Sequence, residues 1–383
     1  MLPETDEHRL IRDSVSALAS DFGHEYFAAQ AKAGSNVDKL WKAAGEAGFI
    51  GVNLPEKYGG GGMGISELAI VIEELAAQGC PLLMLVVSPA ICGSIIAKHG
   101  STDLQEKWLP GLASGDLQMS FAITEPNAGS NSHEITTNAT PEGNGWSLSG
   151  TKYFITGVDE SDAILVVANT DRDEKTGKGR LSLFVVPTDA PGLSKTLIPV
   201  EMQAPERQFT LFFDNVKLDA TALIGELNDG LRQVFTGLNP ERITAAAVAN
   251  GISRYALTKA SDYARERSVW GVPIGAHQGV AHPLAEAYIQ VELARLATWR
   301  AADLYDSGED PGEASNIAKF SASEAVLKAL DSSIQTHGGN GLTTEFGLAD
   351  LWFVARLLKT APISREMILN FVGQHSLELP KSY

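Results

Sequence analysis

Glu241 and Arg242, in the stretch LNPERITAAA, are neighbours whose side chains could move a proton beside an anionic ligand. A carboxylate becomes a stronger base when burial raises its pKa, and an arginine can hold an anion next to it. Asn239 and Pro240 are residue types favoured at a helix N-cap and at the first helical position. We therefore expect a helix to begin here, with Glu241 in its first turn. On these residues alone, a glutamate that only complements the helix dipole is the favoured interpretation.

Two segments combine a strand pattern with hydroxyl groups at its end. SFAITEPNAGSN, from Ser120 to Asn131, leads into a turn that exposes hydroxyls and backbone N–H groups, which suits a flat ring edge or an anion. GTKYFITG, from Gly150 to Gly157, could stack Phe154 on a flat ring while Thr156 donates a hydrogen bond. Taken singly, the first is also typical of an ordinary turn and the second of a core strand.

Two further segments could bind phosphate groups. In RERSVWGVPIGAHQ, the arginines could clamp a diphosphate, Trp270 could pack on a purine and Gln278 could reach a polar ligand edge. In QTHGGNG, Gly338 and Gly339 would let backbone approach a ligand closely. The alternatives are a basic helix end and a glycine C-cap. His337, beside these glycines, is interpreted as a packing residue.

A third glycine-rich stretch, YGGGGMG, contains the spacing GxGxxG at Gly59, Gly61 and Gly64. A dinucleotide fingerprint needs a buried strand directly before it. The preceding residues, GVNLPEKY, contain a proline and two charges and make a poor central strand. We therefore expect a loop before a helix here, not a nicotinamide site.

The elements that would position these residues fall into three zones. Residues 1–118 show the apolar spacing of helices, residues 119–225 contain short β-branched or aromatic runs between turns, and residues 226–383 return to long Ala-rich helical segments. The predicted fold is therefore mixed α+β, with an N-terminal helical domain, a middle β-sheet domain and a C-terminal helical bundle.

Composition narrows the possible partners. A net charge of −17 argues against nucleic acid and anionic membrane surfaces. No apolar stretch approaches the ~20 residues of a membrane span, and the N-terminus does not resemble a signal peptide. Two cysteines provide neither a disulfide framework nor a Cys₄ zinc site, and no metal ligand set is apparent. We expect a cytoplasmic protein.

In this order and spacing, FAITEPNAGS, GTKYFITG, RSVWGVPIGAHQ and QTHGGNG resemble the flavin-binding segments of the acyl-CoA dehydrogenase family. The resemblance covers essentially the whole chain. It implies a helical domain, a β domain and a four-helix bundle, assembled as a homotetramer built from two dimers. It also implies bound FAD, an acyl-CoA substrate and an electron-transfer flavoprotein or similar electron acceptor.

The resemblance assigns roles residue by residue. The flavin would be contacted by Phe121, Ile123, Thr124, Gly129, Ser130, Phe154, Ile155 and Thr156. The diphosphate and adenosine part would be held, across the dimer contact, by Arg267, Trp270, Gln278, Gln335, Gly338 and Gly339. The substrate would be contacted by Ser130, Asn239 and Arg242.

The family reaction is FAD-dependent α,β-dehydrogenation, in which a carboxylate removes the α-proton and the β-hydride passes to flavin N5. The position that carries this carboxylate in many members is Pro362 here, whereas isovaleryl- and long-chain-type members carry it in a Glu-Arg pair that matches Glu241 and Arg242. We therefore expect Glu241 to be the base. Pro362 has no N–H to donate to the thioester oxygen, and Glu366 is expected to be solvated. The alternatives are an enoyl-CoA reductase, a flavin-adduct lyase or monooxygenase, and a non-catalytic flavin or CoA-thioester binding protein.

Overall fold

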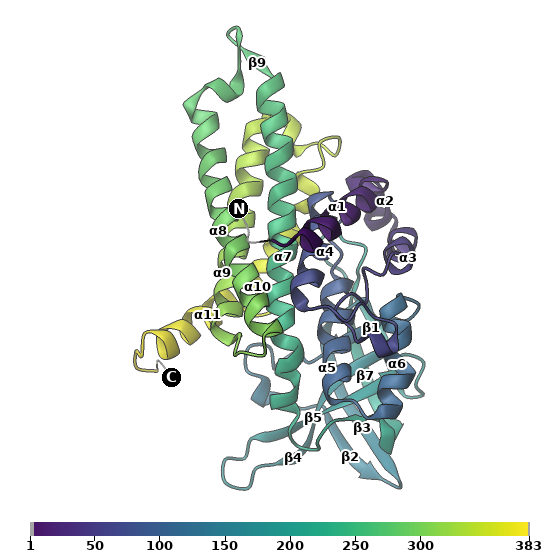
Figure 1. The fold of residues 1–383 in the computed structure, drawn as a ribbon. Helices are drawn as coiled ribbons and strands as arrows, with labels where there is room; N and C mark the ends of the chain where they lie inside the picture. Colours follow the sequence, from purple (N-terminus) through teal and green to yellow (C-terminus); the bar gives the residue numbers. More distant parts are fainter. Residues whose placement is uncertain (1–3, 382–383) are drawn as a thin grey trace.

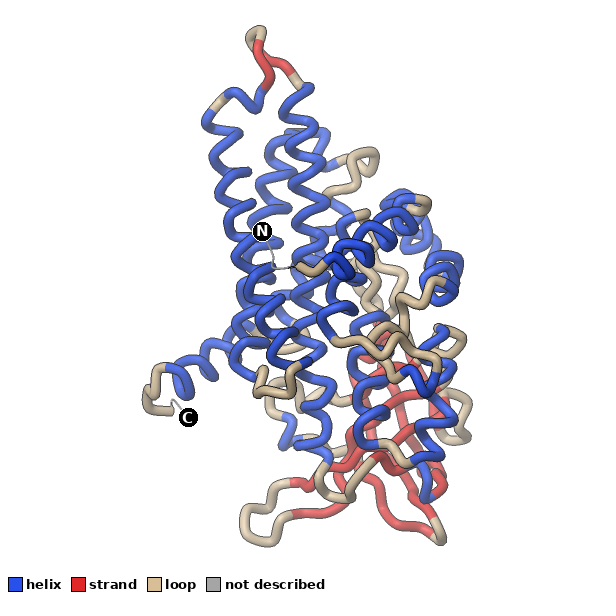
Figure 2. Tube along the Cα trace, in the orientation of Figure 1, coloured by secondary structure: helices blue, strands red, loops and turns tan. Residues whose placement is uncertain are grey.

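The structure, a computed structural model, describes residues 4–381 and consists of helices, then a sheet, then a bundle of long helices (Figures 1 and 2). In this view the first four N-terminal helices lie beside the bundle and above the sheet, and the last two lie at the height of the sheet. They are α1 (Asp6–Ser20), α2 (Gly23–Ala33), α3 (Asp38–Glu46), α4 (Ile65–Ala77), α5 (Ser94–His99) and α6 (Thr102–Ser114), with a 3₁₀ turn at Glu56–Tyr58 and a π-helical segment at Val86–Gly93. A 3₁₀ turn and not a strand precedes the GxGxxG spacing, as expected.

The middle region is one twisted sheet. Its strands are β1 (Met119–Ala122), β2 (Asn138–Glu142), β3 (Gly145–Thr156), β4 (Ala163–Arg172), β5 (Gly179–Pro187), β6 (Leu193–Ile198), β7 (Gln208–Asp219) and β8 (Leu223–Ile224). The main path is β6-β7-β3-β2-β4-β5-β8, and β1 pairs with β4 in parallel. The strand patterns of the sequence are MSFAIT, WSLSGTKYFIT, AILVVAN, LSLFVVP and FTLFFDNVKL, and they match β1, β3, β4, β5 and β7. Strands β2, β6 and β8 have no such counterpart.

The C-terminal bundle is built on three long helices, α7 (Gly230–Glu266), α8 (Gln278–Asp306) and α9 (Gly312–His337). The hairpin of β9 (Ser268–Val269) and β10 (Val272–Pro273) joins α7 to α8 at the tip of the bundle (Figure 1). The shorter α10 (Trp352–Thr360) and α11 (Arg365–Phe371) follow. Many buried side chains of α7 and α9 are alanines, which let the helix axes approach closely. The predicted order of helical, β and helical regions is confirmed.

The predicted helix start at Asn239 is wrong, because α7 begins nine residues earlier at Gly230 and Pro240 lies inside it. Proline has no N–H, so the carbonyl of Thr236, four residues before it, loses its helical partner. The hydroxyl of Tyr305 on α8 donates a hydrogen bond to that carbonyl over 2.9 Å. The neighbouring helix thus satisfies the oxygen that proline leaves free, and Glu241 lies several turns from the positive end of the helix dipole.

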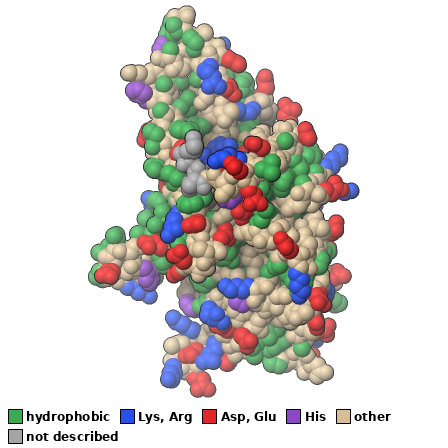
Figure 3. Space-filling view, viewed as in Figure 1, with side chains coloured by type: hydrophobic (Ala, Val, Ile, Leu, Met, Phe, Trp, Pro, Cys, Tyr) green, Lys and Arg blue, Asp and Glu red, His purple; other side chains and the backbone are tan. Residues whose placement is uncertain are grey.

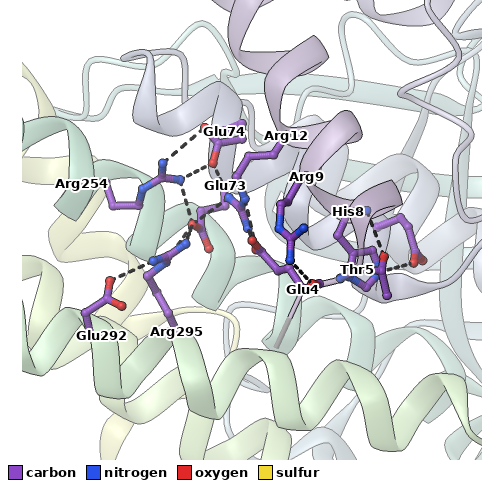
Figure 4. A network of polar contacts seen from close by, with 11 residues as sticks. Glu4, Thr5, His8, Arg9, Arg12, Glu73, Glu74, Arg254, Glu292 and Arg295 are labelled. Atoms are coloured by element: carbon purple, nitrogen blue, oxygen red, sulfur yellow. Dashed lines mark hydrogen bonds and ion pairs between the residues drawn. The ribbon is translucent and has the colours of Figure 1, made fainter. Parts of the chain in front are cut away.

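A network of arginines and glutamates ties the N-terminal helices to the bundle (Figure 4). Glu73 on α4 is buried and accepts from Arg12 of α1 at 3.1 Å, Arg254 of α7 at 2.8 Å and Arg295 of α8 at 2.9 Å. Glu74, also buried, pairs with Arg12 and Arg254. Four helices therefore share one buried cluster of charges. Within residues 4–381, no helix is long and apolar enough to cross a membrane.

Candidate active site

Glu241 lies in the interior of α7, where that helix packs against α9 and the π-helical segment Val86–Gly93. Its carboxylate is partly buried, and no hydrogen bond or ion pair of that carboxylate is found among the described residues. Burial raises the pKa of Glu241 to about 7, although the positive charges of Arg242 and Lys319 act to lower it. The result is a carboxylate that changes its charge near neutral pH, as a general base requires.

Arg242 is buried, and its side chain is held in place by its own helix. Its Nη1 donates to the side-chain oxygen of Asn239 over 2.9 Å, and its guanidinium lies 5.6 Å from the ring centre of Phe235. Asn239 therefore acts within the helix as a hydrogen-bond partner of Arg242 and not as an N-cap. Two of the three predicted substrate residues, Asn239 and Arg242, lie within one turn of Glu241 on α7, whereas Ser130 lies in the turn after β1.

Lys319 on α9 is a charged residue of this site that the sequence interpretation missed. Its side chain is 1% exposed, and its ammonium donates to the backbone carbonyl of Ile363, which follows Pro362. Burial lowers the pKa of Lys319 to about 8, with Arg242 lowering it further and Glu241 raising it. In a sequence, a lysine in an Ala-rich helix is usually interpreted as exposed to solvent. The one sequence feature that indicates burial of Lys319 is its position among small residues.

The turn around Pro362 places no buried carboxylate near Glu241 among the described residues. Pro362 lies between α10 and α11, and Glu366 on α11 is exposed, with its nearest cation, Arg365, 3.9 Å away. The turn around Pro362 thus contributes no buried carboxylate, and the expected solvation of Glu366 is confirmed.

The ends of β1 and β3 bring together the residues predicted to contact a flat ring. The backbone N–H of Tyr153 donates to the carbonyl of Thr124 over 2.9 Å, which holds the two segments side by side. Phe154 is 51% exposed and has a positive φ of 57°, an unusual backbone state for a bulky residue. Thr156 donates its hydroxyl to Gln208 over 3.0 Å. The exposed Phe154 side chain therefore offers an apolar ring to a ligand at the ends of β1 and β3.

The remaining residues of this group differ in what they can offer. Ile155 is 1% exposed and belongs to the core of the sheet, so only its backbone could reach a ligand. Phe121 and Ile123 are partly buried and pack against a second core cluster. Gly129 and Ser130 are exposed, and a side chain at Gly129 would meet nothing within 4 Å. The turn after β1 is therefore open, as a cofactor site requires.

The second predicted group gathers near the tip of the bundle, where the β9–β10 hairpin joins α7 to α8 (Figure 1). Trp270 in the β9–β10 hairpin is 89% exposed, and Arg267, Gln278 and Gln335 are exposed as well. No hydrogen bond or ion pair of the Arg267 guanidinium is found within residues 4–381. The open backbone at Gly338 and Gly339, where an added side chain would meet nothing within 4 Å, completes this group.

His337, next to these glycines, has a packing role, as expected. Its ring lies 4.3 Å from that of Tyr263, and its Nδ1 lies 2.8 Å from the carbonyl of Ser333. In the part of the chain that the structure describes, no group of three or more His, Cys, Asp or Glu side chains is arranged to hold a metal ion.

The two groups fit different parts of FAD. An exposed Phe154 and an open polar turn suit the flavin ring, whereas an exposed arginine, a tryptophan and bare glycine backbone suit the diphosphate and adenine. The first group lies at the ends of β1 and β3 and the second at the tip of the bundle.

Comparison with known proteins covers the whole of this architecture. Family models match in three consecutive parts: the acyl-CoA dehydrogenase N-terminal domain at residues 5–116, the middle domain at 120–216 and the C-terminal domain at 228–377. Acyl-CoA dehydrogenase FadE12 of Mycobacterium tuberculosis is 54% identical over 99% of this chain and 98% of its own length. The mitochondrial long-chain specific acyl-CoA dehydrogenase of Sus scrofa is 31% identical over 92% of this chain and 82% of its own length.

Solved structures agree with these matches. A glutaryl-coenzyme A dehydrogenase in complex with glutaryl-CoA superposes with a TM-score of 0.94 at 28% identity, covering 100% of this chain and 98% of the other. A glutaryl-CoA dehydrogenase from Mycobacterium smegmatis in complex with FADH2 gives 0.91 at 25% identity, covering 99% and 96%.

Proposed function

This chain belongs to the acyl-CoA dehydrogenase family of FAD-dependent oxidoreductases that act on CH–CH groups, and we propose that Glu241 is its catalytic base. The observation that carries the proposal is the unpaired, partly buried carboxylate of Glu241 in the interior of α7, with its pKa raised to about 7. A carboxylate in that state takes a proton readily near neutral pH.

In the proposed reaction, an oxygen of the Glu241 carboxylate removes the proton on the α-carbon of the acyl-CoA thioester. Bound FAD would supply the redox chemistry by taking up the hydrogen of the β-carbon as hydride. Arg242, fixed by Asn239 over 2.9 Å, offers its remaining N–H groups to the substrate. The largely buried neighbours of Glu241 on α7 would strengthen these electrostatic contacts.

We further propose that Phe154, Thr156 and the turn at Gly129 and Ser130 hold the flavin ring of FAD. The polar and glycine residues at the bundle tip would hold the diphosphate and adenosine of the same molecule, supplied by a second copy of the chain. Support comes from the exposed ring of Phe154 and the open turn at Gly129 and Ser130, from the exposed polar residues at the bundle tip, and from the exposed apolar residues of α8, which are Tyr288, Ile289, Leu293 and Leu296. Hydrophobic side chains reach the surface along the bundle in Figure 3.

A homo-oligomer built as a dimer of dimers is the assembly that these features support. An electron-transfer flavoprotein or similar acceptor would reoxidise the enzyme, and a cytoplasmic location stays a prediction.

Pro362 distinguishes this site from one that carries its base in the turn between α10 and α11. Without an N–H, residue 362 cannot donate to the thioester oxygen. Loss of one such donor costs about 10²–10³ in rate where the reaction depends on it. An enoyl-CoA reductase or a flavin-adduct enzyme on the same fold would tolerate this loss and is the alternative.

The proposed function is tested with the FAD-loaded protein under anaerobic conditions. Saturated acyl-CoA thioesters of different chain length and branching are added, and the flavin absorbance is followed. Dehydrogenation predicts bleaching by at least one acyl class, whereas oxidation of prereduced protein by enoyl-CoA without forward bleaching would favour the reductase.

A further inference from the structure

A buried glutamate without a cation lies where the sheet meets the N-terminal helices. Glu206, in the loop between β6 and β7, is 3% exposed, and no ion pair of its carboxylate is found within residues 4–381. Burial raises the pKa of Glu206 to about 7, although hydrogen bonds from backbone N–H groups act to lower it. Burying a carboxylate without a positive partner costs stability. The presence of Glu206 is therefore better explained by what it holds in place than by a stabilising charge.

One oxygen of the Glu206 carboxyl holds the chain that leads into the π-helical segment. It accepts from the backbone N–H of Leu83 over 2.6 Å and from that of Met84 over 3.4 Å. The π-helical segment begins two residues after Met84 and packs against α7. The approach is close, because a side chain added at Gly237, about one turn before the proposed base, would lie 2.9 Å from the carbonyl oxygen of Ile91. Glu206 therefore fixes the start of a segment that contacts the helix of the base.

The two residues after Glu206 bind the strand end that we propose to hold the flavin ring. The carbonyl of Arg207 accepts from the backbone N–H of Gly157 over 2.9 Å. The side-chain oxygen of Gln208 accepts from the hydroxyl of Thr156 over 3.0 Å. Residues 206–208 thus join the end of β3 to the start of the π-helical segment.

The side chain of Met84 makes a second contact between these two parts. Its sulfur lies against the backbone of Gly157, because a Cβ added at Gly157 would lie 2.5 Å from that sulfur. The φ of Gly157 is 65°, in the left-handed region that favours glycine. A shift of Leu83 and Met84 would therefore be passed on to Gly157 and to Thr156 beside it.

The other oxygen of the Glu206 carboxyl faces a small cavity of about 10 Å³. This oxygen, Oε2, has no hydrogen-bond partner among the described residues, and the same holds for Oε1 of Glu160 and Oε1 of Gln118, which line the same cavity. An amide at position 206 would find acceptors here for its N–H groups. Glu206→Gln can therefore lose the charge and keep an oxygen for the N–H of Leu83.

We propose that Glu206 is a positioning residue for the proposed reaction, in that its carboxyl sets the spacing between the flavin-binding end of β3 and the π-helical segment that contacts α7. This inference rests on the proposed roles of Glu241 and of the end of β3. The reaction is sensitive to such spacing, because a misplacement of about 1 Å can cost about 10²-fold in rate.

The test compares three variants of the FAD-loaded protein. Glu206→Gln keeps the acceptor, Glu206→Asp shortens the side chain by one methylene, and Glu206→Leu removes the acceptor. Glu201→Gln, exposed in the same loop, is the matched control. Hydrogen exchange of the peptide that contains Leu83 and Met84 reports the hydrogen bonds to residue 206. Visible circular dichroism reports the surroundings of the bound flavin, and anaerobic bleaching by a saturating acyl-CoA reports the rate.

We expect Glu206→Asp and Glu206→Leu to exchange these amides faster, to change the flavin dichroism and to bleach about tenfold or more slowly per bound FAD. Glu206→Gln and Glu201→Gln should stay close to wild type in all three measurements. A purely structural role would lower the unfolding temperature but leave the dichroism and the rate per bound FAD unchanged. That result in Glu206→Asp, or in a folded Glu206→Leu, would overturn the inference.

Failure of the proposed function has a different signature. If no acyl-CoA bleaches the wild-type flavin, the proposed reaction is wrong. Hydrogen exchange and flavin dichroism of the same variants then still decide whether Glu206 positions the end of β3 against the π-helical segment.

Discussion

The ammonium of Lys152 on β3 lies 2.9 Å from a carboxylate oxygen of Glu125, in the turn after β1, and both side chains are almost fully buried. The same ammonium donates to the carbonyl of Ile123 over 3.0 Å, while Glu125 accepts from the backbone N–H groups of Thr136 and Thr137. One ion pair thus fixes both segments that we propose to hold the flavin ring.

We predict that Lys152→Met loses FAD and unfolds more easily. Removing one partner of a buried pair typically costs about 3–5 kcal/mol, because the other charge stays buried and unpaired. Bound FAD, read from its absorbance after gel filtration, and thermal unfolding measure the two effects. Lys217→Met, on the exposed pair with Glu142 in the same sheet, is the control and should change little. Equal FAD retention in both variants would contradict this role.

The same pair predicts sensitivity to acid. Burial would raise the pKa of Glu125, but Lys152 and the hydrogen bonds from Thr136 and Thr137 outweigh it and lower the pKa to about 2. Because the folded-state pKa is lowered, the stabilisation is complete above the ordinary value of 4.5 and is lost as the pH falls toward 2. Unfolding by urea at a series of pH values should show this slope in wild type and a smaller one in Glu125→Gln.

Glu73→Gln should weaken the attachment of the N-terminal helices to the bundle. Burial would raise the pKa of Glu73, but Arg295, Arg12 and Arg254 outweigh it, so the group is ionised at neutral pH. Its neutralisation leaves three arginines with less compensation, and we expect a loss of about 3–5 kcal/mol in the free energy of unfolding. Urea denaturation checks this value, with the exposed Glu286→Gln as the control. Similar unfolding curves for the two variants would show that the network is not stabilising.

The raised pKa of Glu241 predicts how the rate depends on pH. Only the ionised carboxylate accepts a proton, so kcat/KM should rise about tenfold per pH unit below about 7 and level off above it. Stopped-flow measurement of flavin bleaching between about pH 5 and about pH 8 gives this profile. A rate that is flat across this range would argue against a base with this pKa.

Trp270→Ala tests the shared FAD site at the bundle tip. The side chain is 89% exposed and meets the His277 ring at a distance of 5.9 Å, so its loss should leave the fold intact. We expect FAD affinity to fall several-fold, because an aromatic contact contributes about 0.5–1.5 kcal/mol. Release of FAD on dilution measures the affinity, and ultracentrifugation reports the assembly. The exposed Leu10→Ala serves as the control; equal FAD release from both variants would place the adenine elsewhere.

Much of this architecture can be predicted from the sequence because local patterns encode it. The 3.6-residue period indicates the long helices, and β-branched runs indicate β3, β4, β5 and β7. The short, largely exposed β6 lacks such a run, since few of its side chains need burial.

The candidate site depends on contacts between distant segments, which local patterns do not contain. Asn239 and Pro240 look like a helix start, yet α7 continues through them because Tyr305 satisfies the carbonyl that Pro240 leaves free. Lys319 looks like a solvated lysine, and only its bond to Ile363 and its burial against α7 reveal its position. Family resemblance was enough to select Glu241 from the sequence. Its raised pKa could not be predicted, because it depends on the residues that the fold packs around it.

The central claim is that the base lies on α7 at Glu241. The most direct measurement is anaerobic flavin bleaching by the acyl-CoA that reduces wild type, repeated with FAD-loaded Glu241→Gln and, as a control for the other nearby carboxylate, Glu366→Gln. We predict that Glu241→Gln binds the thioester but bleaches about 10²–10⁴-fold more slowly, while Glu366→Gln behaves like wild type. Bleaching at the wild-type rate in Glu241→Gln would contradict the account and move the base to another residue.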